Sequence, residues 1–186
     1  MSEHISVNGV SDKGANLIIK IDTKERKIAE TFADVRKVND EAFYKKGRGA
    51  FKREDILCGA LAEIAAFYYL HDVGVHVDYP DFSVHIKKSY AADLTDGLNL
   101  YHVKGQTRES ERLYGCSYLC QKRDKLVTQP TLSDILLLCV VDVDANEVEI
   151  KGEIKAVDVK WGEAKVEWLR FNKKALYLKD NLKKMY

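Results

Sequence analysis

The sequence lacks the features that mark membrane, fibrous and multidomain proteins. No apolar run approaches the roughly eighteen residues needed to span a bilayer, and residues 1–14 lack the basic and apolar segments of an export signal. There is no internal repeat and no low-complexity stretch, and only two prolines, Pro80 and Pro130, interrupt the chain. We therefore expect a single domain over residues 1–186 that is neither exported nor embedded in a membrane.

Disulfide-like cysteine spacing and excess charge are also missing. The four cysteines, of which Cys58 and Cys139 lie inside apolar runs, favour reduced thiols and a cytoplasmic protein. The net charge of +1 excludes a general attraction to polyanions. Basic residues still outnumber acidic ones by ten to five from Lys24 to Arg53 and by six to three from Lys104 to Lys125. Such segments are usually solvated surfaces and become interesting only if a site lies between them.

Apolar residues, in contrast, make up 46% of the chain, which is enough for a buried core. The strongest helix prediction covers residues 54–74, where two acids suit the positive first turn and a glycine suits the end. Residues 134–144 form a nearly continuous apolar run, typical of a central strand covered on both faces. The remaining predicted segments are a strand and basic helix within 1–53, extended pieces at 75–79 and 82–86, a hairpin at 91–107, a helix within 108–127, and strands and a closing basic helix within 143–186. The core, residues 54–142, is thus predicted as helix, three strands, helix and strand (αβββαβ).

The predicted hairpin carries three ionisable side chains. If Asp96–Gly97 forms the two-residue turn that this dipeptide favours, Asp93 is opposite Leu100. Because directly opposite residues and alternate residues share a face of a sheet, Asp93, His102 and Lys104 then project from one side. The turn aspartate is expected for backbone reasons, and an exposed ion pair is the plain alternative for Asp93 and Lys104.

The predicted helix over residues 54–74 has one formal charge in its apolar stretch from Ile56 to Leu70, and that charge is Glu63. A buried carboxylate is costly unless a cation or a metal compensates it. Either Glu63 lies on a narrow solvent-facing stripe, or it points into a polar cleft over the sheet. We follow the second interpretation, because a second polar cluster is expected on the hairpin.

Three segments together resemble a known family. They are GALAEIAAFYYL with Glu63, AADL with Asp93 and YHVKGQT with Lys104. An inward Glu on a first helix, an Asp at the end of one strand and a Lys at the end of the next resemble the PD-(D/E)XK nuclease superfamily. The resemblance covers about residues 54–142 and includes a later helix with Gln121. It implies an α/β (mixed α+β) fold with a restriction-endonuclease-like core, in which helices flank a central mixed β-sheet.

The resemblance implies a metal-dependent endonuclease that hydrolyses DNA phosphodiester bonds in restriction, repair, recombination or phage DNA metabolism. One or two Mg²⁺ or Mn²⁺ ions would be held by the Asp93 carboxylate, the Val103 carbonyl and Glu63. Lys104 would stabilise charge on the scissile phosphate and orient the attacking water. DNA is the expected partner and RNA the alternative, and a homodimer is a candidate assembly because many such enzymes cut both strands as symmetric dimers.

Other polar residues are secondary candidates. Gln106 and Gln121 could hydrogen-bond the phosphate or the lysine, or could lie plainly on the surface. Tyr118, four residues after Tyr114, could stack on bases, although half-buried helix surface is the more ordinary role. The candidates for nucleic-acid contact are Arg108, Arg112, Lys122, Arg123, Lys125 and Tyr118.

One position departs from the family pattern. His102 stands where the superfamily normally has Glu or Asp, two residues before the lysine. Imidazole is a poor Mg²⁺ ligand and an acceptable Mn²⁺ ligand, so a metal-binding His102 predicts higher activity with Mn²⁺. His102 could otherwise act as a general base or be a satisfied histidine, and a zinc site with Cys116 and Cys120 lacks a fourth ligand. The alternative functions are a catalytically weakened nuclease-fold protein that binds nucleic acid or a protein partner, and a ribonuclease.

Overall fold

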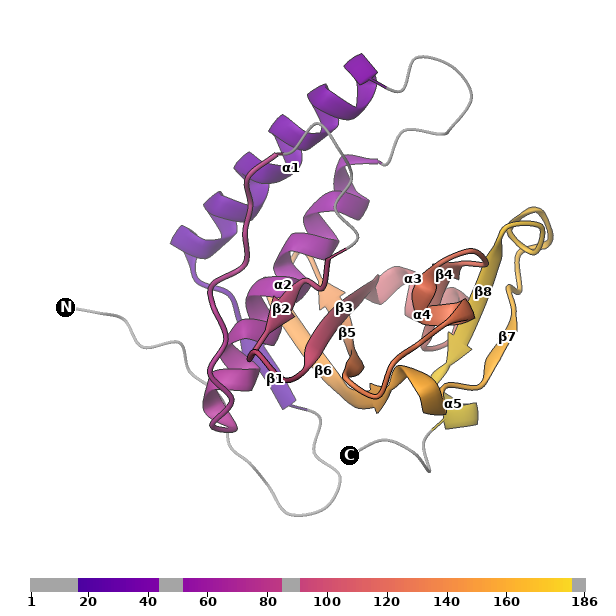
Figure 1. Cartoon of the computed structure of the whole chain (residues 1–186). Coiled ribbons are helices and arrows are strands. Elements are labelled where there is room, and N and C mark those ends of the chain that lie inside the picture. Colours follow the sequence, from indigo (N-terminus) through magenta and orange to yellow (C-terminus); the bar gives the residue numbers. More distant parts are fainter. Residues whose placement is uncertain (1–16, 44–51, 85–90, 182–186) are drawn as a thin grey trace.

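The structure is a computed structural model that describes residues 17–43, 52–84 and 91–181 (Figure 1). Within these ranges the chain forms a mixed α/β fold with two sheets and two long helices. The helices are α1 (Thr23–Phe43), α2 (Arg53–Asp72), α3 (Arg108–Tyr114), α4 (Lys125–Thr128) and α5 (Leu178–Asn181), with the short 3-10 turns η1 (Ala156–Asp158) and η2 (Glu167–Leu169). The strands are β1 (Leu17–Lys20), β2 (Leu94–Thr95), β3 (Leu100–Thr107), β4 (Ser117–Gln121), β5 (Asp134–Asp142), β6 (Glu147–Lys155), β7 (Trp161–Glu163) and β8 (Lys173–Tyr177).

The larger sheet has five strands in the order β1-β6-β5-β3-β2. It is mixed, because β3 and β5 are parallel whereas the other neighbouring strands are antiparallel. The smaller sheet has three antiparallel strands in the order β4-β8-β7. A parallel pair requires a crossover connection, and the crossover from β3 to β5 contains α3, β4 and α4. The smaller sheet therefore begins beside β3.

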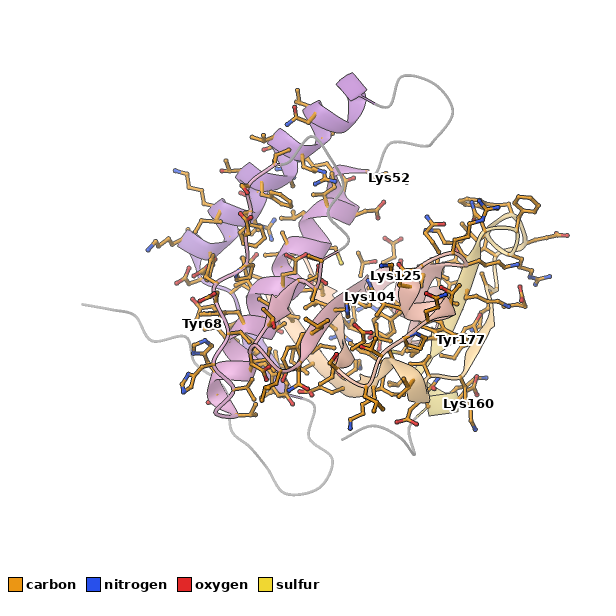
Figure 2. All side chains as sticks on the ribbon, in the orientation of Figure 1. Lys52, Tyr68, Lys104, Lys125, Lys160 and Tyr177 are labelled. Atoms are coloured by element: carbon orange, nitrogen blue, oxygen red, sulfur yellow. The ribbon has the colours of Figure 1, made fainter. Side chains whose placement is uncertain are left out.

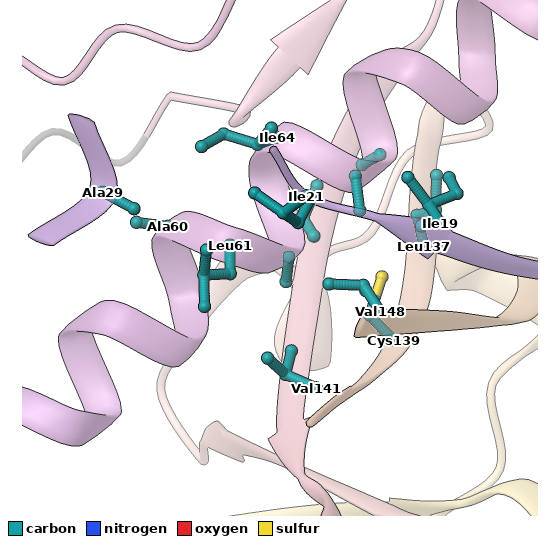
Figure 3. Close-up of a cluster of buried hydrophobic side chains, with 14 of the residues drawn as sticks. Ile19, Ile21, Ala29, Ala60, Leu61, Ile64, Leu137, Cys139, Val141 and Val148 are labelled. Atoms are coloured by element: carbon teal, nitrogen blue, oxygen red, sulfur yellow. The ribbon is translucent and has the colours of Figure 1, made fainter. Parts of the chain in front are cut away.

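Helix α2 is apolar nearly all round because it lies between α1 and the larger sheet (Figure 1). Its side chains Leu61 and Ile64 are fully buried and belong to one cluster with Ile19, Leu137 and Cys139 from β1 and β5 (Figure 3). Full burial of a side chain of this size contributes about 1.5–3 kcal/mol. This cluster fixes α2 against the sheet and so fixes the polar side chain that α2 carries.

Gly105 of β3 lets α2 approach the strand backbone closely. A Cβ atom at this position would lie 3.1 Å from Ala62 Cβ and 3.2 Å from the Cys58 carbonyl oxygen. Real Cβ atoms rarely come so close to neighbouring atoms, so a larger residue would push the helix and the strand apart. The contact also keeps the next residue of α2, Glu63, near the β3 backbone.

The opposite face of the larger sheet packs against the smaller sheet. Leu136, Leu138 and Ile154 form a second buried cluster with Tyr118 of β4 and Leu176 of β8. The prediction of a mixed sheet is confirmed. Long helices cover one of its faces, and a three-stranded sheet with the short helix α4 covers the other.

The sequence predicts the ends of the core better than its middle. The helix predicted at 54–74 corresponds to α2, and the strand predicted at 134–144 corresponds to β5. Residues 75–84 contain no strand within the described part, and the extended piece predicted at 82–86 lies partly outside it. The helix predicted within 108–127 is present only at the two ends of this segment, as α3 and the short α4, because residues 117–121 between them form the strand β4. Of the predicted closing helix, residues 173–177 form the strand β8 instead, residues 178–181 form the short helix α5, and residues 182–186 lie outside the described part.

No helix in the described ranges combines the length and apolarity needed to cross a bilayer. All four cysteines are free thiols, and those of Cys58, Cys120 and Cys139 are buried. Cys120 lies on the strand β4, so the helical spacing that would have paired it with Cys116 is not formed. Cys116 instead has its Sγ 3.2 Å from the Tyr118 hydroxyl.

Candidate active site at the edge of β3

The hairpin of β2 and β3 turns through a longer loop than predicted. Thr95 pairs with Leu100, so residues 96–99 form a four-residue loop in place of a two-residue turn. Oδ1 of Asp96 closes this loop by accepting hydrogen bonds from two of its backbone N–H groups, at 2.8 and 2.6 Å. The predicted pairing of Asp93 with Leu100 is therefore wrong by two residues. Because side chains alternate with a period of two, such a shift keeps each residue on its predicted face.

Asp93 is fixed at an edge of β3 that β2 leaves uncovered. In the described residues β2 covers only the start of β3, and beyond it Oδ2 of Asp93 accepts a hydrogen bond from the Val103 N–H at 2.7 Å. The Asp93 N–H in turn donates to the Tyr101 carbonyl at 3.0 Å. The N–H and C=O of one strand residue point to the same side, so the Val103 carbonyl faces this edge as well.

Lys104 follows on the same strand and lies between α2 and the smaller sheet (Figure 2). Its positive charge opposes the rise that burial causes in the pKa values of Glu63 on α2 and of Asp93. The same charge acts on the pKa of Cys120 of β4. Glu63 thus lies within electrostatic range of the hairpin residues. The structure brings the side chains of Glu63, Asp93 and Lys104 into one electrostatic cluster, which we call the β3-edge cluster.

The two carboxyl groups of the β3-edge cluster resist ionisation. Burial, together with the negative charge of Asp93, raises the pKa of Glu63 to about 8, although Lys104 opposes the change. Burial also raises the pKa of Asp93, against the opposing charge of Lys104 and the hydrogen bond from Val103. The negative charge of Asp93 adds to the effect of burial on Glu63, so the two carboxyl groups do not ionise independently.

The donor atoms at this edge fit a hard divalent cation that takes only a few of its ligands from the protein. They are two carboxyl groups and one backbone carbonyl, which are the oxygen donors that Mg²⁺ and Mn²⁺ accept. Among the described residues no group of three or more His, Cys, Asp or Glu side chains could hold a metal ion. Mg²⁺ commonly binds through one or two carboxylates and keeps water or phosphate oxygens in its other positions. A cation would also compensate the charge that burial makes costly on Glu63 and Asp93.

His102 has a different partner, which sequence reasoning missed. Its Nε2 lies 3.0 Å from Oδ1 of Asp134, and both side chains are only 12% exposed. Oδ2 of Asp134 accepts further hydrogen bonds from the backbone N–H and the hydroxyl of Thr131, both at 2.7 Å. Although burial opposes the change, these hydrogen bonds lower the pKa of Asp134. This contact corresponds to the interpretation of His102 as a satisfied histidine and occupies the ring nitrogen Nε2.

The two glutamines have structural partners. Gln106 is buried, donates from Nε2 to the Gly115 carbonyl at 3.0 Å and accepts at Oε1 from the Ser117 N–H at 2.8 Å. Both ends of its amide therefore hold the corner between α3 and β4, and neither is directed to a phosphate. Gln121 lies at the end of β4 opposite Lys173 of β8, on a strand and not on the predicted helix.

Two of the predicted nucleic-acid contacts are directed inward. Tyr118 is 3% exposed in the second core, and burial raises the pKa of its hydroxyl, so the prediction that it stacks on bases is wrong. Arg108 forms ion pairs with Glu111 at 2.6 Å and with Glu149 at 2.8 Å. Lys151 contacts the same two acids, which makes Arg108 part of a compensated internal network.

The other predicted contacts lie on the surface around β4. Arg112 of α3 is exposed, as are Arg123 and Lys125 at the turn from β4 to α4. Lys122 is half-buried, and its backbone N–H donates to the Asn172 carbonyl at 2.9 Å. These residues belong to α3, α4 and the end of β4, and so lie on the smaller-sheet side of β3.

A groove of about 760 Å³ lies elsewhere, between α1 and the segment with Phe82 and Val84. It is mostly apolar, and none of the candidate site residues lines it. Its lining residues are Lys24, Lys27, Ile28, Thr31, Phe32, Val35, Asn39, Phe82 and Val84. Because α2 lies between α1 and β3, this groove is separate from the β3-edge cluster (Figure 1).

Comparisons with known proteins found no relative of this chain. No family model matches the sequence, and no curated protein or solved structure matches it significantly. What the chain does is therefore inferred from its own residues, above all Glu63, Asp93 and Lys104.

Proposed function

We propose that this chain is a metal-dependent nuclease with a restriction-endonuclease-like core, and that it hydrolyses phosphodiester bonds of DNA. One observation carries the proposal: two half-buried carboxyl groups, Glu63 and Asp93, lie within electrostatic range of the Lys104 ammonium at the edge of β3. The Val103 N–H donates to Asp93 at this edge, and the carbonyl of the same strand residue points to the same side. Oxygen donors beside a fixed positive charge suit metal-assisted attack on a phosphate.

The fold supports the proposal. Strands β3 and β5 are parallel neighbours in a mixed sheet, and α2, which carries Glu63, packs on one face of that sheet. The acid on the first core helix, the acid before β3 and the lysine on β3 therefore come from three separate elements. Elements held by a common core give the cluster a fixed geometry, which metal-dependent hydrolysis requires.

Each residue has its own task in this proposal. The carboxylates of Glu63 and Asp93 and the Val103 carbonyl would hold the cation. A bound Mg²⁺ or Mn²⁺ supplies polarisation of a phosphoryl oxygen and a more acidic bound water. Lys104 places a positive charge where negative charge develops on the phosphate, and it orients the attacking water by hydrogen bonding. Asp134 of β5 holds the ring of His102, which lies on β3 two residues before Lys104.

A second candidate function is nucleic-acid binding without turnover. It is favoured by the pairing of His102 with Asp134, which leaves two carboxyl groups and one carbonyl as the donors at the edge. A weakened nuclease of this kind would bind nucleic acid in a salt-sensitive manner. Its binding would not change on replacement of Asp93, and it would show no turnover.

The two functions are separated by a cleavage assay with matched variants. Single-stranded, double-stranded and branched DNA, together with RNA, are incubated with the protein in Mg²⁺, in Mn²⁺ and in a chelator. We expect metal-dependent cleavage that falls at least about 100-fold in Asp93→Asn and in Lys104→Ala. Lys160→Ala is the control, because Lys160 is an exposed lysine apart from Lys104 and its loss changes the charge equally (Figure 2).

Circular dichroism checks that each variant keeps its fold. Failure to cut any of these substrates with either metal contradicts the nuclease proposal, and retained salt-sensitive binding then supports the second candidate. Cleavage of RNA in preference to DNA would keep the chemistry and change the substrate. Equal loss of activity in Lys160→Ala would remove the special role given to Lys104.

A further inference from the structure

The loop between β7 and β8 presents two aromatic side chains to solvent. Trp168, in η2, is 76% exposed, and Phe171 is 90% exposed. Figure 1 shows this loop projecting at the end of the smaller sheet. Large aromatic side chains are normally at least half covered, because their exposure to water is unfavourable. Two of them together at the end of one loop point to a surface that is covered by a partner.

The loop is held in a defined shape by its own hydrogen bonds. Arg170 donates from Nε to the Ala164 carbonyl at 2.9 Å and from Nη2 to the Lys165 carbonyl at 3.3 Å. Lys165 Nζ in turn donates to the Tyr114 carbonyl at the end of α3. Ala164 is buried beneath the loop. The aromatic side chains are therefore presented by an anchored loop, which lowers the entropic cost of binding a partner.

The charge around this loop is positive. Residues 163–174 contain four basic residues and two acidic ones. The hydrogen bond from the Lys122 N–H to the Asn172 carbonyl, at 2.9 Å, brings Lys122 and its neighbour Arg123 beside the loop. One of the loop's acids, Glu163, is already paired with Lys174. A partner that covers Trp168 and Phe171 thus meets a basic surround, which favours a polyanion.

The loop is also linked to the β3-edge cluster through β4. Lys104 is close enough for its charge to act on Cys120 of β4, and Lys122, two residues later, contacts the loop backbone. At about 3.3 Å per residue, Cys120 and Lys122 are separated by only about 7 Å along the chain. A flexible polyanion could contact the aromatic loop and the cluster at the same time.

We propose that Trp168 and Phe171 stack on unpaired bases of single-stranded DNA. Exposed aromatic side chains within a basic surface are the combination that binds single strands, because every base has a face on which an aromatic ring can stack. In a duplex these faces are covered by neighbouring base pairs. This inference rests on the proposed nuclease function and narrows its substrate to DNA that contains a single-stranded segment.

Intrinsic fluorescence tests the proposal without any metal or cleavage. The chain has two tryptophans, and Trp161 is half-buried against the second core, so Trp161→Phe leaves Trp168 as the reporting fluorophore. We expect oligo(dT) to quench this fluorescence and duplex DNA of equal length to quench it much less. Trp168→Ala and Phe171→Ala, followed with a labelled oligo(dT), should each weaken binding by about 5- to 150-fold.

Leu98→Ala is the matched control, since Leu98 is an apolar side chain with 84% exposure in the loop between β2 and β3. Unchanged oligo(dT) affinity in Trp168→Ala and Phe171→Ala overturns the inference, even if DNA cleavage is observed. Weakened binding in both variants supports it, even if no cleavage is found and the nuclease proposal fails. A change of oligomeric state in Trp168→Ala with unchanged oligo(dT) binding would assign the loop to a protein contact and also overturn the inference.

Discussion

Replacement of Glu63 by glutamine should change how stability depends on pH. In the folded protein burial and the charge of Asp93 raise the pKa of Glu63 to about 8, well above the ordinary glutamate value of 4.5. Between these values the native state keeps a proton that the unfolded chain releases. Unfolding therefore releases a proton, and the free energy of unfolding falls by up to about 1.4 kcal/mol for each unit by which the pH rises. Glutamine is neutral in both states and abolishes this contribution.

The expected magnitude is large enough to measure. From pH 5.5 to 7.5, Glu63→Gln should gain at most about 2.7 kcal/mol of stability relative to the wild type. For a domain of this size, that difference corresponds to a relative shift in Tm of about 5–10 °C. The assay is thermal unfolding followed by circular dichroism at several pH values. Glu54→Gln is the control, because Glu54 lies exposed on the same helix.

Parallel pH profiles for the wild type and Glu63→Gln would refute the reasoning, because they would mean that Glu63 ionises in the folded protein as it does in water. Divalent cations provide a second check. At pH 7.5, Mn²⁺ at 100 times its Kd should stabilise the wild type by about 2.7 kcal/mol. The same concentration should stabilise Glu63→Gln less, since one carboxylate is gone.

Two further predictions concern the parts that hold the β3-edge cluster. Gly105→Ala should destabilise the protein by about 1–3 kcal/mol, because the added Cβ would lie 3.2 Å from the Cys58 carbonyl oxygen. Gly59→Ala lies in α2, where the added Cβ would meet no atom within 4 Å apart from the adjacent residues and backbone of its own helix, and it should instead stabilise by about 0.5–1 kcal/mol. Urea unfolding distinguishes the signs, and equal effects would contradict the close packing of α2 on β3. Asp134→Asn should cost about 1–3 kcal/mol and release the His102 ring, which nitrogen chemical shifts of the imidazole would report; an unchanged tautomer would show that the pair does not form.

The elements that local patterns define were predictable. The apolar run of α2 and the continuous apolar strand β5 both lie where the sequence places them. The helical interpretation is wrong for residues 117–121, because their spacing is that of a strand. Tyr118 and Cys120 are two residues apart and both buried, which is the period of a strand. Alternation in this short segment was the available signal.

In the hairpin the predicted turn length is wrong, but the predicted side-chain faces are unchanged. An Asp-Gly dipeptide favours a two-residue turn, but Asp96 also accepts hydrogen bonds from backbone N–H groups further along the loop. That local interaction lengthens the loop by two residues. An even shift preserves the alternation, so Asp93 and Lys104 keep the relation that the sequence suggests. A shift of one residue would have separated them.

Contacts that depend on distant pairing were beyond the sequence. Asp134 begins β5, and it reaches His102 only because β3 and β5 are parallel neighbours with Leu100 in register with Asp134. Gln106 shows the same limit, since its partners lie at the corner where α3 leads into β4. Periodicity describes one element at a time, whereas these contacts follow from the arrangement of several.

The pairing of β1 with β6 has a consequence for how the protein forms in a cell. Leu17 pairs with Ile150, so β1 leaves the ribosome roughly 130 residues before its partner, on the order of ten seconds at usual rates of synthesis. The segments that supply Glu63, Asp93 and Lys104 are likewise made before β5 and β6. Until then the apolar faces of α1 and α2 have no sheet to cover them, and they are open to chaperones and to aggregation. The cluster can therefore assemble only after most of the chain has been translated.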